Sequence, residues 1–276
     1  MNDRAVTLLE QYDIEIIKTR KGRGAILCDT PQGTLTFKEY TGTEARLVAE
    51  NQLLQSITAK GQVCTDALIP TKEGTFSVKD RDGISYILKT YVDGRECDIY
   101  NQEECKVAME LLAGLHNAMD SVDTEGKGVN DSPLQEYEKR NRELAHIRSF
   151  LGKKGQKQPF ERYLKSCMDT YLEQAKQVTK EWQQYEEERG DRQVTVGFCH
   201  GDYQYHNILF AEDRWYVVNF EKCHQGSQVT DIYLMMRKLL EKSDWAQELG
   251  RDLLDAYQKV RPIPAYDYVD LYYRLA

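Results

Sequence analysis

The first third of the chain alternates apolar and polar positions, which indicates β-strands, except for one interval with helical spacing. Strands are predicted at residues 14–17, 24–29, 34–40, 75–78 and 85–92. In the third strand Leu35 and Phe37 share one face, and Lys38 lies on the other. Residues 43–57 have helical spacing, and Thr43 is suited to cap this helix because its hydroxyl can accept a backbone N–H. We therefore expect a small β-rich unit with one helix.

Beyond Asp93 the pattern becomes mainly helical. Apolar residues at helical spacing predict a helix at 103–119. Two highly charged helical stretches, at 134–152 and 159–188, are separated by a short break rich in Gly and Lys, and they predict a long helical hairpin. The last amphipathic stretch reaches Ala276 without a helix stop signal, which is compatible with a natural chain that continues.

These patterns predict an α+β protein in two parts. Residues 1–93 form a small β-rich part, and residues 94–276 form a larger, mainly helical part. The helical part contains an insertion at 134–188 and a loop region at 199–221, in which a polar loop is followed by two short strands.

Charge and cysteine content narrow the class of protein. The net charge of −8 and a pI near 5.3 argue against nucleic-acid binding, because contact with a phosphate backbone needs a basic surface. No apolar run approaches the length of a membrane span, and the first residues lack the basic region and apolar core of a standard secretion signal, so we expect neither a membrane span nor secretion by such a signal. The seven cysteines have no metal-binding spacing, which fits free thiols in a reducing cytosol. The sequence therefore predicts a cytoplasmic protein.

The strongest candidate for chemistry is the polar loop that begins near residue 199. Asp202 is followed five positions later by Asn207, and His200 precedes it by two positions. An aspartate on a loop can accept the proton of an attacking hydroxyl, and an asparagine at this spacing can bind Mg²⁺ through its amide oxygen. The strand, turn and strand that follow are the arrangement such a site needs. The pattern predicts the catalytic loop of a kinase-like phosphotransferase, and an ordinary polar turn is the competing interpretation.

One residue departs from this pattern. The second strand should present a carboxylate to the Mg²⁺ that bridges the nucleotide phosphates, but the position holds Asn219. An asparagine keeps the shape and one oxygen ligand but removes a full negative charge, so the affinity for metal should fall. If the strand stays extended, Glu221 faces the same side as Asn219, and we expect its carboxylate to reach the same metal.

Two segments of the β-rich part are candidates for holding nucleotide phosphates. Lys38 lies on a predicted strand and Glu50 on the following helix, so the lysine can contact phosphate oxygens while the carboxylate holds it in place. Glu44 is the competing partner on that helix, and an exposed strand lysine without function is the alternative. Gly22 and Gly24 lie in a predicted turn whose backbone N–H groups can cover a nucleotide, although two glycines usually mark only a turn.

Asp231 begins the helix that follows the loop region. Its carboxylate can accept hydrogen bonds from the loop backbone or can cap the helix, and the two roles are not exclusive. We expect Asp231 and His200 to support the site structurally. His116 and His224 have no ligand spacing and are predicted to be structural.

These residues occur in an order that resembles a known group of enzymes. The matching positions are Lys38, Glu50, the hinge-like segment 91–97, the helix end 112–116, His200-Gly201-Asp202 with Asn207, Asn219-Phe220-Glu221, and Asp231-Ile232-Tyr233. In this order the chain resembles the aminoglycoside and choline phosphotransferase superfamily, and within it the CotS-type spore-coat proteins of spore-forming Firmicutes. The resemblance covers nearly the whole length, including the helical insertion.

The resemblance implies a two-lobed protein-kinase-like fold, with a β-rich N-terminal lobe over the nucleotide and ATP and Mg²⁺ bound in the cleft. By motif match it implies that Asp202 is the catalytic base, that Asn207 is a metal ligand, and that Lys38 and Glu50 are the pair that orients the phosphates. Catalytic members of the superfamily carry aspartate where this chain has Asn219. Choline-kinase-like members also carry an acid at the place of residue 221.

Three functions are compatible with these observations. The first is ATP- and Mg²⁺-dependent phosphoryl transfer to a small hydroxyl substrate. The second is a catalytically inactive protein with a structural or regulatory role in the spore coat. The third is a kinase that acts on coat proteins. The partner is accordingly a small molecule or a protein of the spore coat.

Overall fold

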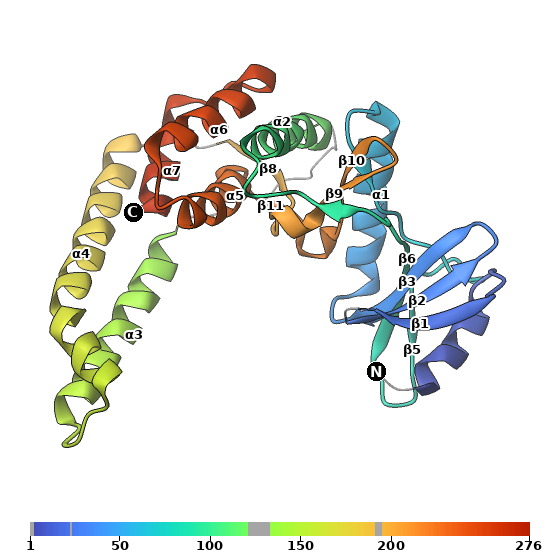
Figure 1. Ribbon diagram of the computed structural model, residues 1–276, viewed down its shortest axis with the longest axis horizontal. Helices are drawn as coiled ribbons and strands as arrows, with labels where there is room; N and C mark the ends of the chain where they lie inside the picture. Colours follow the sequence, from blue (N-terminus) through green and yellow to red (C-terminus); the bar gives the residue numbers. More distant parts are fainter. Residues whose placement is uncertain (1–2, 23, 121–132, 191–194) are drawn as a thin grey trace. The chain divides into compact units, whose positions relative to one another are not determined.

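The computed structural model describes residues 3–22, 24–120, 133–190 and 195–276, and its elements are labelled in Figure 1. The chain forms two compact units, one made of residues 1–125 and 197–262 and the other of residues 126–196 and 263–276. The boundary predicted near residue 93 falls inside the first unit and stays a prediction.

An antiparallel five-stranded sheet forms the beginning of the first unit. Its strands, in spatial order, are β1 (Lys18–Gly22), β2 (Ala25–Thr30), β3 (Gly33–Tyr40), β6 (Ser85–Thr90) and β5 (Ser77–Lys79). One face packs on the 3-10 helix η1 (Asp3–Gln11), and there Phe37 stacks on Tyr86 with ring centroids 5.2 Å apart. The strand predicted at 14–17 is wrong, because the first strand begins at Lys18 and the apolar side chains before it pack on this core instead.

Helix α1 (Glu44–Lys60) follows β3, as the spacing of its apolar residues predicted. The hydroxyl of Thr43 accepts the N–H of Arg46 at 3.4 Å, so the predicted N-cap is confirmed. The helix ends at Gly61, whose φ of 65° lies in the left-handed region that favours glycine.

The second face of the sheet packs on α1. Leu47 of the helix lies in one buried cluster with Tyr40 of β3 and Ile87 of β6. Because side chains alternate along a strand, Lys38 and Lys89 share the face of Tyr40 and Ile87. Two lysines on neighbouring strands therefore point toward the same helix, the arrangement from which the candidate site is built.

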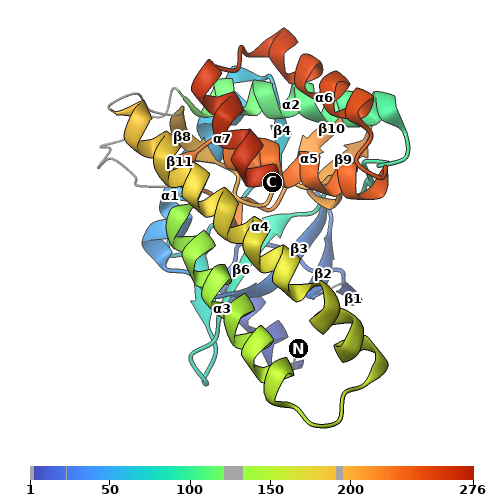
Figure 2. The ribbon, with the colours of Figure 1, turned by 90° about the vertical axis from the view of Figure 1, so that its left-hand side faces the viewer.

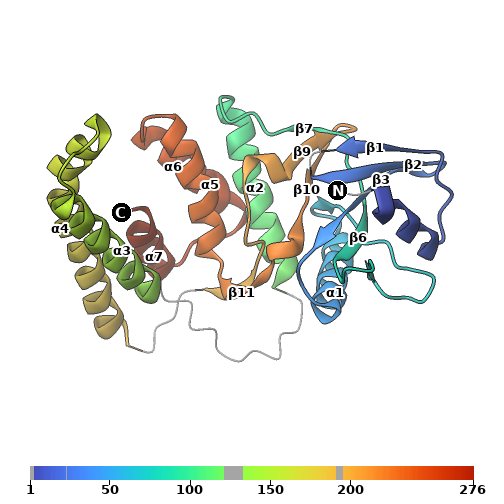
Figure 3. The same cartoon turned by 90° about the horizontal axis from the view of Figure 1, so that it is seen from below.

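The remainder of the first unit combines small sheets with three helices. The second sheet has the order β4 (Cys64–Thr65), β10 (Arg214–Val217), β9 (Ile208–Ala211) and β7 (Arg95–Glu96), and β8 (Val196–Cys199) pairs with β11 (His224–Ser227). The helices are α2 (Gln102–Met119), α5 (Val229–Lys242) and α6 (Gln247–Val260). Figure 3 shows α2 beside α5 and α6, with which it packs. The helix predicted at 103–119 is thereby confirmed.

The second unit contains the predicted helical hairpin, α3 (Leu134–Lys153) and α4 (Pro159–Arg189), together with α7 (Ala265–Leu275). Figure 2 shows α3 and α4 running side by side. The buried ring of Trp182 lies 5.4 Å from the ring of Tyr273 and 5.5 Å from that of Tyr185, so an aromatic cluster joins α4 to α7. Among the helices of the described residues, none combines the length and the hydropathy of a membrane span.

Candidate functional site

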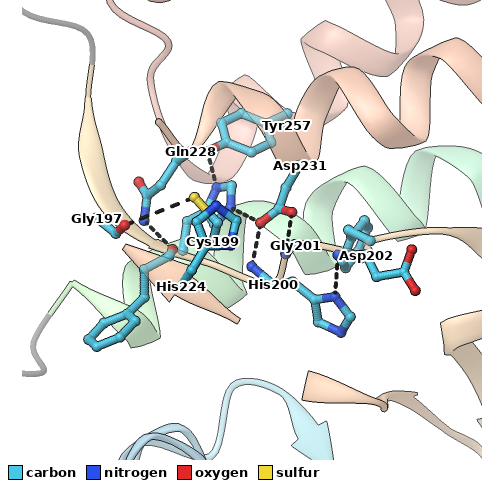
Figure 4. A network of polar contacts seen from close by, with 12 residues as sticks. Gly197, Cys199, His200, Gly201, Asp202, His224, Gln228, Asp231 and Tyr257 are labelled. Carbon is cyan, nitrogen blue, oxygen red and sulfur yellow. Dashed lines mark hydrogen bonds and ion pairs between the residues drawn. The ribbon is translucent and has the colours of Figure 1, made fainter. Parts of the chain in front are cut away.

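The loop between β8 and the 3-10 turn η2 (Tyr205–Asn207) is held by a buried carboxylate. Asp231, in the first turn of α5, accepts the N–H of His200 at 2.6 Å and the N–H of Gly201 at 2.9 Å (Figure 4). The N-cap of α5 is Gln228, so the helix-capping alternative for Asp231 is wrong. Two backbone donors of the loop are satisfied by one side chain, which holds the loop in a single conformation.

Asp231 also contacts His116 on α2. The Nε2 atom of His116 lies 3.3 Å from Asp231 Oδ2, and its Nδ1 atom lies 2.8 Å from the hydroxyl of Tyr257. Burial acts to raise the pKa of Asp231, but His116, His200 and the loop N–H groups outweigh it, and the pKa lies below its usual value. The structural role predicted for His116 thus includes this network, in which Tyr257 is a member that no local sequence signal marked.

The buried ring of His200 links the loop to the end of β10. Its Nδ1 atom accepts the N–H of Asp202 at 3.2 Å, and its Nε2 atom lies 3.0 Å from the carbonyl oxygen of Val218. A backbone N–H only donates and a carbonyl only accepts, so this geometry assigns the proton to Nε2 of a neutral ring. Burial lowers the pKa of His200 despite the opposing charge of Asp231, which favours the same neutral form.

Close backbone approach brings Lys222 to the loop. Gly201 has a φ of 77°, and a Cβ atom there would collide with the carbonyl of Lys222, so only glycine fits. The carboxylate of Asp202 is then bonded on both oxygens: Oδ2 lies 3.0 Å from Lys222 Nζ, and Oδ1 accepts Gln204 Nε2 at 2.6 Å. Figure 4 shows this carboxylate directed away from Asp231.

The surroundings of Asp202 keep it ionised. Burial acts to raise its pKa, but the ammonium group of Lys222 and the amide of Gln204 outweigh burial and hold the pKa below its usual value. The side chain keeps 21% exposure, so an acceptor can reach it. Sequence spacing alone did not predict either partner.

A chain of hydrogen bonds joins the predicted phosphate and metal residues. Lys38 Nζ donates to Asn219 Oδ1 at 3.1 Å, and Asn219 Nδ2 donates to Asn207 Oδ1 at 2.8 Å. Asn207 Nδ2 then donates to the carbonyl oxygen of Asp202 at 2.8 Å. The structure therefore brings together residues that are far apart in the sequence.

Glu221 joins the same group by an unexpected route. Strand β10 ends at Val217, Asn219 has a left-handed backbone with φ 68°, and the 3-10 turn η3 (Phe220–Lys222) follows. The extended strand on which the prediction for Glu221 depended is therefore wrong. Asparagine tolerates the left-handed region better than most residues, and the turn brings Glu221 Oε1 to 2.6 Å from Lys38 Nζ.

The predicted pair of Lys38 and Glu50 is also wrong. Glu50 is buried on α1 and bonds to Lys89, with Oε1 3.0 Å from Lys89 Nζ. The ammonium group of Lys89 lies 2.9 Å from Asp66 Oδ2 and 3.6 Å from Glu221 Oε1. The competing partner, Glu44, does not take Lys38 either, because its carboxylate binds the backbone after residue 75.

Charge and burial oppose each other in this cluster. Burial acts to lower the pKa of Lys89, but Asp66, Glu50 and Glu221 outweigh it and raise that pKa, so the ammonium form persists. Burial raises the pKa of Glu50 although Lys89 opposes it. Lys89 and Asp66 were missed at the sequence level. The available signal was alternation, which puts Lys89 on the face of the fully buried Ile87.

The two glycines predicted to cover the nucleotide lie elsewhere in the sheet. Gly22 ends β1 opposite Ala25 of β2, and Gly24 has a φ of 69°. Arg23, within the predicted turn, lies outside the described residues. As far as the described residues extend, no hydrogen bond joins these glycines to the Lys38 group, and their contact with a nucleotide stays a prediction.

The residues predicted to bind Mg²⁺ do not fit that ion in this arrangement. Mg²⁺ prefers carboxylate oxygens and waters in octahedral geometry, and ammonium groups beside those oxygens oppose its binding. The amide oxygens of Asn207 and Asn219 each accept an N–H, and Glu221 Oε1 contacts Lys38 and Lys89. Within the described part of the chain, no group of three His, Cys, Asp or Glu side chains is placed to hold a metal.

Comparison with known proteins supports the fold and the family. The profile of the phosphotransferase enzyme family matches residues 24–272, so the chain belongs to that family. No curated protein sequence matches the chain.

Three solved structures illustrate the similarity of fold. An aminoglycoside phosphotransferase from Alicyclobacillus acidocaldarius subsp. acidocaldarius DSM 446 has a TM-score of 0.82 at 20% identity, covering 98% of this chain and 82% of its own. The amicoumacin kinase hAmiN, in complex with AMP-PNP, Ca²⁺ and Ami, has a TM-score of 0.67 at 10% identity, covering 99% and 83%. A microcompartment-associated aminopropanol kinase has a TM-score of 0.64 at 13% identity, covering 98% and 84%. These matches confirm an α+β kinase-like fold with a β-rich N-terminal sheet and a helical C-terminal part.

Proposed function

We propose that this member of the phosphotransferase enzyme family binds a nucleoside triphosphate and transfers its terminal phosphoryl group to a hydroxyl of a small molecule. The observation that carries the proposal is the ionised, accessible carboxylate of Asp202 on a loop held by Asp231. The solved kinases with this fold support the class of reaction, since one was captured with the ATP analogue AMP-PNP.

Each group has a defined part in the proposed reaction. Asp202 accepts the proton of the acceptor hydroxyl as its oxygen bonds to the terminal phosphorus, and the bond from that phosphorus to the bridging oxygen breaks. The products are a phosphorylated small molecule and a nucleoside diphosphate. The ammonium group of Lys38, which begins the hydrogen-bonded chain, and that of Lys222, which contacts the Asp202 carboxylate, offset the negative charge of the phosphates.

The test is transfer from ATP to a panel of small amino alcohols and aminoglycosides. Asp202→Asn should lower the rate constant by about 10²–10⁴-fold while leaving the affinity for AMP-PNP unchanged. Asp213→Asn is the matched control, because Asp213 is exposed on the turn between β9 and β10 and should have no effect. Transfer at the wild-type rate by Asp202→Asn would refute the assignment of the base.

A second candidate is a non-catalytic component of the spore coat. It is favoured by one observation, the amide of Asn219 at the position where catalytic members carry a carboxylate, and by the CotS-type resemblance. This candidate predicts that no acceptor is phosphorylated and that Asp202→Asn leaves assembly into the coat unchanged.

A further inference from the structure

The ammonium group of Lys38 lies among the residues that were predicted to bind phosphate and metal. In a kinase-type site a glutamate of the helix pairs with the lysine of the strand. Here Glu50 pairs with Lys89 instead of Lys38. The ammonium group of Lys38 instead lies between Asn219 Oδ1 at 3.1 Å and Glu221 Oε1 at 2.6 Å. These are two of the three oxygens predicted to hold the metal ion, so Lys38 takes the place of a cation between them.

The direction of the hydrogen bonds shows that this arrangement is self-consistent. Lys38 can only donate, so Asn219 turns its oxygen to Lys38 and its NH₂ group to Asn207. At the other end the carbonyl of Asp202 can only accept, so Asn207 turns its NH₂ group there and its oxygen to Asn219. Every bond in the chain has one donor and one acceptor. An aspartate at position 219 has no N–H for Asn207 and would break the chain.

Lys89 is the second part of the arrangement. Its side chain is fully buried and contacts Glu50, Asp66 and Glu221. Asp66 Oδ2 also accepts the backbone N–H of Asn219 at 3.3 Å. The cluster therefore positions the backbone of Asn219 through Asp66, and its lysine stands with Lys38 beside the carboxylate of Glu221.

We propose that this site binds nucleotide phosphates without a divalent cation, with Lys38 as the built-in cation between Asn219 and Glu221. The proposal rests on the proposed nucleotide binding. In this site the amide of Asn219 accepts a hydrogen bond from Lys38 and donates one to Asn207, so the asparagine supports a metal-free site.

Calorimetric titration with AMP-PNP, in EDTA and in Mg²⁺, tests this proposal. The dissociation constants of the wild type in the two buffers should agree within about threefold. A loss of affinity of about tenfold or more in EDTA would overturn metal independence while leaving the proposed nucleotide binding in place. No binding in either buffer, by a protein whose near-ultraviolet circular dichroism shows a packed core, would refute the proposed function and this inference together.

In the Asn219→Asp variant, in contrast to the wild type, we expect AMP-PNP binding to depend on Mg²⁺. Its carboxylate faces Asn207 Oδ1 and lies beside Glu221, so affinity for AMP-PNP in EDTA should fall and Mg²⁺ should restore it. The melting temperature of the free variant should also rise on addition of Mg²⁺, whereas that of the wild type should not. Asn219→Gly is the matched control, since it breaks the chain without adding charge, accepts the left-handed backbone at this position, and should show no Mg²⁺ effect. Equal Mg²⁺ responses of the wild type and Asn219→Asp would overturn the assignment of Lys38 as the cation.

Discussion

The network around Asp231 and the cluster around Lys89 are both buried and charged, but they satisfy their polar atoms to different degrees. Both oxygens of Asp231 have partners, in the loop N–H groups and His116. In the Lys89 cluster, Glu50 Oε2, Asp66 Oδ1 and Glu221 Oε1 are buried and have no hydrogen-bond partner among the described residues, although Glu221 Oε1 is in ion-pair contact with Lys38. Three carboxylates there face two ammonium groups, which leaves one excess negative charge when all are ionised.

This difference in hydrogen bonding indicates that the Asp231 network and the Lys89 cluster have different roles. A fully bonded network specifies a single geometry, as the loop that carries Asp202 requires. In the Lys89 cluster the two lysines are the cations, and the pKa of Glu50 is raised first by burial and then by the charges of Glu221 and Asp66. The Asp231 network therefore fixes the position of the loop that carries Asp202, and the carboxylates of the cluster hold the ammonium groups of Lys38 and Lys89.

Asp231→Ala should have the largest effect on stability. It leaves two backbone N–H groups and His116 without an acceptor in a buried site, which should cost about 3–5 kcal/mol of unfolding free energy. Urea unfolding measures this, with the exposed Asp213→Asn as control, because asparagine tolerates the left-handed backbone of that turn. A loss of unfolding free energy below about 1 kcal/mol would show that other contacts hold the loop. It would contradict the contrast drawn between the Asp231 network and the Lys89 cluster.

Lys89→Met should cost about 3 kcal/mol, because it leaves buried carboxylates without their cation. Adding Glu50→Gln should recover part of this loss, about 1 kcal/mol or more, since one unpaired charge is removed. The double-mutant cycle in urea gives the coupling directly. Additive losses in the two single variants would mean that Lys89 does not compensate Glu50.

Lys222→Met tests the ionisation of Asp202 and should have the smallest effect. The pKa of Asp202 in the fold lies below its unfolded value of about 3.9, so the ionised form adds stability above that pH, and the gain is lost as pH falls through the folded pKa. Without Lys222 the pKa should rise and the loss of stability in acid should become shallower. Urea unfolding between about pH 2 and pH 6 measures this, with Lys222→Arg as control. Superimposable curves for the wild type and Lys222→Met would contradict the role of the Asp202–Lys222 pair.

Local spacing was enough to predict several elements and the candidate loop. Thr43 and the apolar positions after it predicted α1, and the break between two charged stretches predicted the α3–α4 hairpin. The five-residue step from Asp202 to Asn207 predicted the candidate loop, and in the structure Asn207 bonds to the backbone of Asp202. In each case the information lies within a few residues, where backbone geometry converts spacing directly into position.

The partners of the lysines were decided only by the tertiary structure. Lys38 and Lys89 lie on one face of neighbouring strands, and sequence separation does not show which of them Glu50 will meet. That choice depends on the register of β3 with β6, on the packing of α1 across them, and on the left-handed turn at Asn219 that carries Glu221 inward. Alternation and helical spacing determined which side chains face inward, whereas the pairing of buried charges followed from distances between elements that only the packed fold defines.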